Sequence, residues 1–182
     1  MYKKVATPVL KGDRTILKPL SKSFCNQKYL SWLNDPEVYK YLSSGGDFTM
    51  KQLVNFVREK SFEDIFFWAI IVKENNNHIG NIKIDKIDKN DLHGEYGIMI
   101  GDKSVWGMGY AAEVSKIVID FCFNVVGLKE IRLGVHKENI PAIKLYQKLG
   151  FSIVSPHSIS EADPISSKYY LRMTLGNLSF CE

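Results

Sequence analysis

The sequence predicts an α+β (mixed α/β) fold, in which a central, mostly antiparallel, twisted sheet of about seven strands carries helices on both faces. Apolar runs of strand length are separated by segments in which apolar residues recur at helical spacing. Short polar turns connect the strand-like runs between residues 65 and 101, which favours an antiparallel meander. The length of 182 residues, without an internal repeat or a linker, predicts one domain, residues 1–182.

The N-terminal part of the chain is predicted to be mainly helical. A short first strand lies within residues 13–19. A helix is expected to start at Ser21 and to stop before Pro36, because the residue before a proline is pushed out of the helical region. A short second helix follows. A third begins at Thr49, where Thr49 and Gln52 have the spacing of a capping box.

Three strands are predicted in the middle of the chain. Residues 65–73 form a near-continuous apolar run that is rich in β-branched and aromatic residues, which suits a strand buried on both faces. Residues 78–88 follow after a polar turn. In residues 95–101 the pattern alternates, so Glu95 and Met99 share one face of the strand and apolar residues take the other.

A glycine-bearing loop joins the third of these strands to the next predicted helix. From Gly109 onward apolar residues recur at helical spacing, until Gly127 supplies a left-handed stop. Gly107 and Gly109 leave backbone N–H groups unpaired at the positive end of the helix dipole, which is typical of a phosphate site. A tight connection without a ligand is the alternative interpretation. The spacing excludes a nucleoside triphosphate loop and a dinucleotide fingerprint.

The C-terminal part is predicted to add a strand, a helix and two further strands. Residues 130–135 form a strand that is parallel to the strand of Glu95 if the connection has the usual handedness. Asn139 caps the helix that follows, and Gly150 ends it. The last two strands are expected in residues 151–154 and 168–175.

Composition restricts the partners and the compartment. A net charge of +4 tolerates an anionic small molecule but falls short of the footprint of a nucleic-acid-binding protein. No apolar run approaches the roughly 18 residues of a membrane span, and the N-terminus lacks a signal-peptide core, so a cytoplasmic location is expected. Cys25, Cys122 and Cys181 have no metal or disulfide spacing and are expected to be inert thiols.

Three segments together resemble the GNAT superfamily of acyl-CoA N-acyltransferases. The phosphate loop of that family, Q/R-x-x-G-x-G/A, maps onto Trp106, Gly107, Met108, Gly109, Tyr110 and Ala111, with Trp106 in place of the usual Gln or Arg. The later family signature is matched by Asn139, Leu145, Tyr146, Gly150 and Phe151. The segment WLNDPEVYKYL, residues 32–42, resembles the branch that contains ribosomal-protein N-terminal, spermidine and amino-sugar acetyltransferases.

The resemblance implies a GNAT-like fold and an acetyl-CoA-dependent N-acetyltransferase that uses no metal. Acetyl-CoA would pair its pantetheine arm with the backbone of residues 98–100, place its pyrophosphate on residues 107–112, and have its thioester polarised by an N–H near Met99. The residues assigned to this co-substrate are Ile98, Met99, Ile100, Trp106, Gly107, Met108, Gly109, Tyr110, Ala111, Ala112, Asn139 and Ala142.

Two side chains are candidates for proton transfer. Glu95 is the candidate base, acting through water because it lies about 13 Å along the strand from Met99. Tyr146 is the candidate acid for the CoA thiolate. The alternatives are a solvated strand-face carboxylate for Glu95, a core tyrosine for Tyr146, and a helix cap alone for Asn139. His136 stands at a strand end and is expected to be structural or exposed.

The acceptor class follows from the same resemblance. A primary amine attacks the thioester directly, and a protein N-terminus, a polyamine, an amino sugar and an antibiotic amine all present that nucleophile. The expected partner is therefore a small-molecule or peptide amine, with no nucleic acid and no membrane, and a homodimer is allowed. A non-catalytic domain that binds or senses acyl-CoA, or a site for another phosphate ligand, is the alternative.

Overall fold

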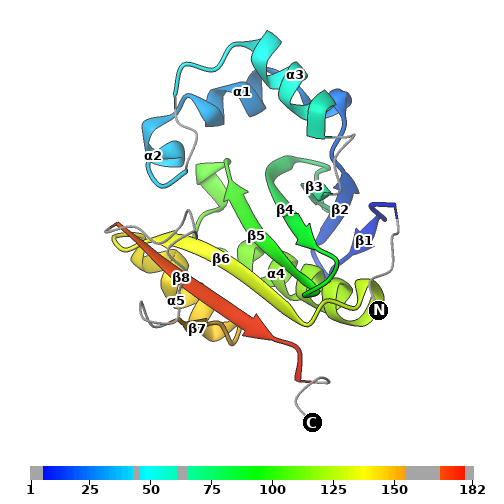
Figure 1. Cartoon of the computed structure of the whole chain (residues 1–182). Helices are drawn as coiled ribbons and strands as arrows, with labels where there is room; N and C mark the ends of the chain where they lie inside the picture. The colour runs from blue at the N-terminus through cyan, green and yellow to red at the C-terminus, as the bar shows by residue number, and fades with distance from the viewer. Residues whose placement is uncertain (1–5, 43–45, 61–64, 155–168, 179–182) are drawn as a thin grey trace.

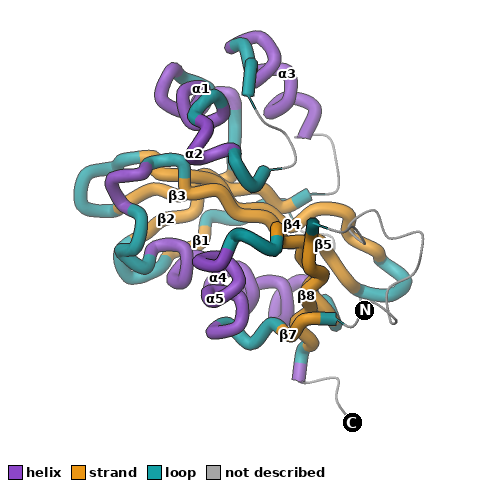
Figure 2. Tube along the Cα trace, turned by 90° about the vertical axis from the view of Figure 1, so that its left-hand side faces the viewer, coloured by secondary structure: helices purple, strands orange, loops and turns teal. Residues whose placement is uncertain are grey.

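The computed structural model describes residues 6–42, 46–60, 65–154 and 169–178. They form one open sheet with strand order β1-β2-β3-β4-β5-β6-β8-β7, and every neighbouring pair is antiparallel except β5 and β6. Helices cover both faces: in Figure 2, α1, α2 and α3 lie above the strands and α4 and α5 below them. The predicted fold class, the antiparallel meander and the parallel β5–β6 pair are confirmed.

The strands match the predicted runs closely, as Figure 1 allows the reader to follow. They are β1 Leu10–Lys11, β2 Thr15–Pro19, β3 Phe66–Val72, β4 His78–Asp88, β5 His93–Ile100, β6 Glu130–His136, β7 Ser152–Ile153 and β8 Tyr170–Gly176. β1 was not predicted, because two residues are too few to leave a periodic pattern.

The helices fill the connections between strands. They are the 3-10 turns η1 Lys22–Phe24 and η2 Lys103–Val105, the α-helices α1 Gln27–Leu33, α2 Pro36–Tyr39, α3 Met50–Lys60, α4 Tyr110–Asp120 and α5 Ile140–Lys148, and the π-helical segment Phe121–Val126 that extends α4. Gly127, with φ of +81°, ends that segment as predicted.

Side-chain caps decide where the N-terminal helices begin. The prediction of an α-helix from Ser21 is wrong, because Ser21 starts only a 3-10 turn. The α-helix begins after Asn26, whose Oδ1 accepts a hydrogen bond from the Tyr29 N–H at 2.9 Å. The capping box of α3 is confirmed: the Thr49 N–H donates to Gln52 Oε1 at 2.8 Å, and the Gln52 N–H donates to Thr49 Oγ1 at 3.3 Å.

Two apolar clusters hold these layers together. The larger lies between the sheet and α4 and α5, with Ile82, Val118 and Ile131 fully buried. The smaller lies on the other face and contains buried side chains of the helices there, such as Trp32 of α1 and Leu53 of α3. Strand β3 is buried on both faces, as its apolar run predicts.

Two sequence expectations concern membranes and thiols. Among the described helices, none combines the length and the apolar character that crossing a bilayer requires. Cys25 and Cys122 are free, and burial raises the pKa of both thiols above the ordinary value, which suits unreactive side chains. Cys181 lies outside the described residues.

Candidate active site

The parallel pair β5 and β6 opens into a gap. The two strands are paired over three residues only, ending at Glu95 and Arg132. Beyond that point β5 continues against β4 to Ile100, and β6 continues against β8 to His136. From Tyr96 onward, one edge of β5 therefore has no neighbouring strand among the described residues. An open strand edge presents N–H and C=O groups to which an extended ligand can add.

The backbone groups on this open edge belong to Ile98 and Ile100. The Gly101 N–H donates to β4 at 2.9 Å, whereas the Ile100 carbonyl accepts from Trp106 Nε1 at 2.8 Å. Because successive residues of a strand direct their backbone groups to opposite edges, Ile98 faces the gap and Met99 faces β4. An N–H donor near Met99 would therefore come from a neighbouring residue.

The loop after β5 brings further N–H groups to the gap. Gly109 is the N-cap of α4 with φ of +81°, and Gly107 has φ of +76°, so both need the left-handed freedom of glycine. A glycine cap has no side chain to accept from the first turn, which leaves the N–H groups of residues 110–112 to solvent or a ligand. A Cβ on Gly107 would meet nothing within 4 Å, so the loop is open to solvent there.

A carboxylate in the first turn of α4 is bound by residues at the start of β2. Glu113 Oε1 accepts from the N–H of Arg14 at 2.9 Å and from the N–H and hydroxyl of Thr15 at 3.0 and 2.8 Å. Its Oε2 accepts from Arg14 Nε at 2.9 Å. Burial opposes the charged form, but the hydrogen bonds from Thr15 and Arg14 outweigh it and lower the pKa of Glu113. Arg14 and Glu113 belong to no motif, so the sequence alone does not indicate that they pair.

Tyr146 has a buried ring and an unengaged hydroxyl. Its ring packs edge-on against Tyr96, with centroids 5.8 Å apart, and against Phe151 at 5.9 Å. Burial raises its pKa well above the ordinary value, so the hydroxyl keeps its proton at neutral pH. Among the described residues no group accepts or donates a hydrogen bond at that hydroxyl. The ring is a core group, as the alternative interpretation expected, and the hydroxyl is left for another partner.

Tyr96 ties the same region to α4. Its hydroxyl lies 2.6 Å from Ser115 Oγ, which donates to the Ala111 carbonyl at 2.6 Å. The Ser115 proton is thus committed to Ala111, so Tyr96 is the donor in the first bond. This chain fixes the first turn of α4 relative to β5. Tyr96 and Ser115 each resemble ordinary core and helix residues, so the sequence alone gives no sign of this chain.

Glu95 is half of a buried ion pair. Arg172 Nη1 donates to both of its carboxylate oxygens, at 2.7 and 2.8 Å, and the Arg172 side chain is only 7% exposed. Glu95 pairs with Arg132 on β6, and Gly134 pairs with Arg172 on β8, so the arginine reaches diagonally over a glycine. The alternative of a solvated carboxylate is therefore wrong.

The remaining co-substrate candidates lie around the loop and at the start of α5. Asn139 Oδ1 accepts from the Ala142 N–H at 3.3 Å, which confirms the helix cap and leaves a contact with CoA as a prediction. Trp106 and Met108 are 44% and 55% exposed, so the loop carries two apolar side chains on its surface.

His136 lies at the far end of β6 among aromatic rings. Its ring centroid is 5.4 Å from that of Tyr41 and 5.3 Å from that of Tyr170. Its Nδ1 accepts from the Glu138 N–H at 3.2 Å, and the Tyr41 hydroxyl donates to the Glu138 carbonyl at 3.3 Å. The segment after α2 is thereby joined to the end of β6.

The candidate acid and base lie on opposite faces of the sheet. Tyr96 and Ile98 belong to the cluster under α4 and α5, which also contains Tyr146. Met99 packs with the cluster under α1 and α3, and Glu95 shares its face. At the gap between β5 and β6, a molecule can be reached from both faces of the sheet.

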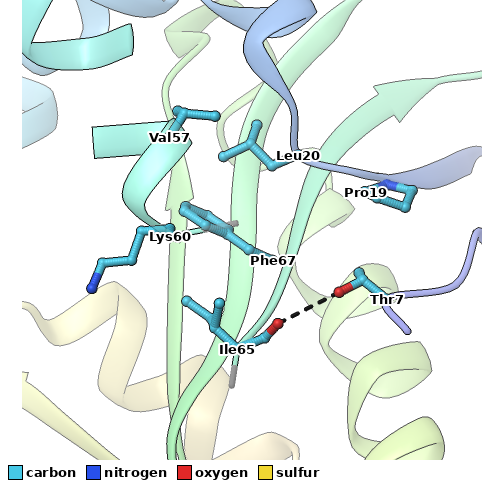
Figure 3. Close-up of a pocket in the computed structure, with 7 residues that line it drawn as sticks. All are labelled: Thr7, Pro19, Leu20, Val57, Lys60, Ile65 and Phe67. Carbon is cyan, nitrogen blue, oxygen red and sulfur yellow. Dashed lines mark hydrogen bonds between the residues drawn. The ribbon is translucent and has the colours of Figure 1, made fainter. Parts of the chain in front are cut away.

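Two other features lie apart from this gap. A hollow of about 240 Å³ between α3 and the strands β2 and β3 is drawn in Figure 3, and Lys60 is the one charged side chain among the described residues that line it. Asp88, Asp91 and His93 bring their ligand atoms within 4.8 Å of one another at the β4–β5 turn. Asp88 already accepts from the N–H of Asp91 at 2.9 Å, and Arg132 lies 3.3 Å from His93, which disfavours a cation there.

Comparison with known proteins identifies the family. The model of the acetyltransferase (GNAT) domain matches residues 14–152, which is most of the chain. The chain belongs to the GNAT acetyltransferase family. Its predicted resemblance to that family is confirmed, and N-acetyltransferase activity of the GNAT type is supported.

Relatives and solved structures agree with this assignment. This GNAT protein is 33% identical to "Uncharacterized N-acetyltransferase p20" of Bacillus licheniformis over 65% of its own length and 68% of that protein. It is 32% identical to the spermidine N(1)-acetyltransferase of Escherichia coli K12, over 52% of its length and half of that protein. The crystal structure of spermidine N-acetyltransferase from Vibrio cholerae in complex with CoA and spermine has the same fold, with a TM-score of 0.76 at 20% identity, covering 93% of this chain and 99% of that one.

Proposed function

We propose that this protein transfers the acetyl group of acetyl-CoA to a primary amine, which attacks the thioester carbon directly. The main support for this proposal is that β5 and β6 separate beside α4, a helix capped by a glycine. One opening then offers a strand edge for the pantetheine amides and unpaired N–H groups for the pyrophosphate. Ile98, at the open edge, is the candidate donor to the thioester oxygen, where negative charge develops during attack.

Tyr146 is proposed to protonate the departing CoA thiolate. A tyrosine hydroxyl carries its proton at neutral pH, and no described residue competes for that proton. Burial raises the pKa of Tyr146 and makes it a weaker acid, so only a modest contribution to thiolate departure is expected. Its ring contact with Tyr96 holds it on the same face as the open edge of β5. Cleavage of the C–S bond leaves the electron pair on sulfur, which takes the phenolic proton and yields CoA thiol.

Glu95 is proposed to accept the proton of the attacking amine through water. An alkylammonium of pKa near 10 is mostly protonated at pH 7, so attack requires loss of a proton. The bond to Arg172 holds the carboxylate on the face opposite Tyr146. Acceptor and co-substrate would then approach from opposite faces and meet at the gap.

The acceptor is proposed to be a small molecule or a peptide with a primary amine. Asp85 lies directly opposite Glu95 on β4, and two neighbouring carboxylates suit a cationic molecule. Each carboxylate is also paired with a cation, Lys83 and Arg172 respectively, so the face is not strongly acidic. Because a sequence relative is named a spermidine acetyltransferase, a polyamine is the first acceptor to test, beside a protein N-terminus and an amino sugar.

Acetyl-CoA-dependent thiol release with a panel of amines tests this function. Spermidine, an N-terminal peptide and glucosamine represent the three classes, and at least one should be acetylated well above the rate of hydrolysis. CoA binding without turnover on any of them would favour a domain that senses acyl-CoA. The Tyr146 hydroxyl argues for the enzyme, because a pure sensor needs no proton donor beside the gap.

A further inference from the structure

Arg14 presents part of its guanidinium to the phosphate loop. Its Nε donates to Glu113 Oε2 and its Nη1 donates to the Met108 carbonyl, both at 2.9 Å. Its Cζ lies 4.4 Å from the centre of the Tyr110 ring. These three contacts fix the plane of the group and leave Nη2, which makes no hydrogen bond to a described residue.

The direction of Nη2 follows from the glycine beside it. A Cβ built on Gly109 would lie 3.5 Å from this nitrogen. Nη2 is therefore next to the N-cap of α4, where the unpaired N–H groups begin. The Arg14 side chain is 49% exposed, so a ligand can reach it.

We infer that Arg14 binds the pyrophosphate of CoA through Nη2, as a cationic arm of the phosphate loop that comes from the strand β2 region. The inference rests on the proposed function, because it assumes that the loop holds CoA. Trp106, at the start of the loop, brings no charge, so the loop itself has only backbone dipoles for an anion. A guanidinium held in one plane matches the oxygens of a phosphate and loses little freedom on binding.

Two other cations near the loop, Lys73 and Lys103, are already engaged. Lys73 Nζ donates to the Gly12 carbonyl, and Lys103 is bound by Asp35 and Glu37. The carboxylate of Glu113 alone would repel a phosphate, but it is paired with the Arg14 guanidinium, which offsets its negative charge. A hollow of about 360 Å³ beside Tyr110 is lined by Asp13 and Glu74 as well as by Arg14 and Lys73, so its charge is balanced and the inference does not extend into it.

Binding of CoA and its fragments to Arg14 variants tests the inference. Calorimetry would compare CoA, 3′-dephospho-CoA and pantetheine on the wild-type protein and on Arg14→Gln. One lost charge-assisted hydrogen bond should weaken CoA and 3′-dephospho-CoA equally, by about ten- to a hundredfold, and leave pantetheine unchanged. If Arg14→Gln binds CoA as tightly as the wild-type protein does, the inference is overturned. A loss confined to CoA would overturn it too, since Arg14 would then contact the 3′-phosphate.

Two control variants separate binding from folding and from net charge. Thr15→Val removes one donor to Glu113 without touching the guanidinium, and it should keep the affinity for CoA. If it weakens CoA as much as Arg14→Gln, the arginine acts only through the packing of α4 and the inference fails. Arg58→Gln removes the same charge from α3 on the other face and should have no effect. A wild-type protein that does not bind CoA would instead refute the proposed function.

Discussion

Arg172 Nη1 lies 2.7 and 2.8 Å from the two carboxylate oxygens of Glu95. Strand β6 lies between the strands of these two residues, and its Gly134 pairs with Arg172. Two consequences follow from this pair. Breaking a buried ion pair from one side is costly, typically about 3 to 5 kcal/mol, so the pair stabilises the β5–β8 region only while both partners remain. The arginine also competes with an incoming amine for the lone pairs of Glu95.

Glu95→Gln tests whether this carboxylate removes a proton. The amide oxygen can still accept from Arg172, so the loss of the negative charge should lower stability while the folded variant keeps its CoA affinity. Turnover should fall most at neutral pH, and the loss should ease as the pH rises and free amine becomes abundant. The measurement is kcat and kcat/KM against pH. A profile that keeps its shape in the variant would reduce Glu95 to a structural partner of Arg172.

Gly109→Glu tests the phosphate loop. The new side chain adds bulk and negative charge beside the N-cap of α4, where the pyrophosphate is proposed to bind. CoA affinity should fall at least tenfold, since a charge-assisted bond is worth about 1.5 to 3 kcal/mol. Calorimetry checks this. Gly109→Ala carries the same strain at φ of +81° without the charge, and Gly176→Glu adds the charge at an open position elsewhere. Unchanged affinity in folded Gly109→Glu would show that the loop assignment is wrong.

Sequence patterns predicted the elements well and the pairs between them poorly. The run 78–88 matches β4, because polar turns bound it on both sides and β-branched isoleucines recur along it. Gly109 and Gly127 mark the limits of the α4 region, because glycine in the left-handed region is a local signal. The start of α1 was misjudged, because Ser21 and Asn26 are both good caps and packing decides between them.

Contacts across the sheet left no trace in the sequence. Arg14 and Glu113 are 99 positions apart, and Glu95 and Arg172 are 77 apart. Neither pair belongs to a motif, and each forms only because strand order brings the residues together. Residue type predicted Glu95 and Tyr146 as candidates. Their surroundings, an ion pair for one and a buried ring for the other, required the fold.

His78 should make stability depend on pH. Burial lowers its pKa below 6.5, although its hydrogen bonds with Asn81 at 3.1 Å and Gly80 at 2.9 Å partly oppose this. In the unfolded chain His78 is protonated as the pH falls through about 6.5, whereas in the folded chain it is protonated only at a lower pH. Stability should be full above pH 6.5 and decrease as the pH falls below it, by at most about 1.4 kcal/mol per pH unit from this group.

Urea unfolding at pH 7.5 and pH 5.5 checks the role of His78. His78→Phe keeps an aromatic ring among those of Phe24, Tyr29 and Trp32 and removes the titration. The free energy of unfolding should then change less between the two pH values than in the wild-type protein. An identical change in both proteins would assign the pH dependence to other groups.

Tyr146→Phe tests the proposed acid. The variant keeps the ring that packs against Tyr96 and Phe151 and removes a hydroxyl that bonds to no described residue, so the free energy of unfolding should change by less than about 0.5 kcal/mol. A thiol of pKa near 8.5 is already a fair leaving group, so kcat should fall by the lower part of the roughly 10²- to 10⁴-fold range of general acid catalysis. Tyr96→Phe is the matched control, because it removes a buried hydroxyl that does bond to Ser115. It should lower stability and, through the first turn of α4, weaken CoA binding, but it should keep kcat at saturating acetyl-CoA. A Tyr146→Phe enzyme with unchanged kcat would leave protonation of the thiolate to water.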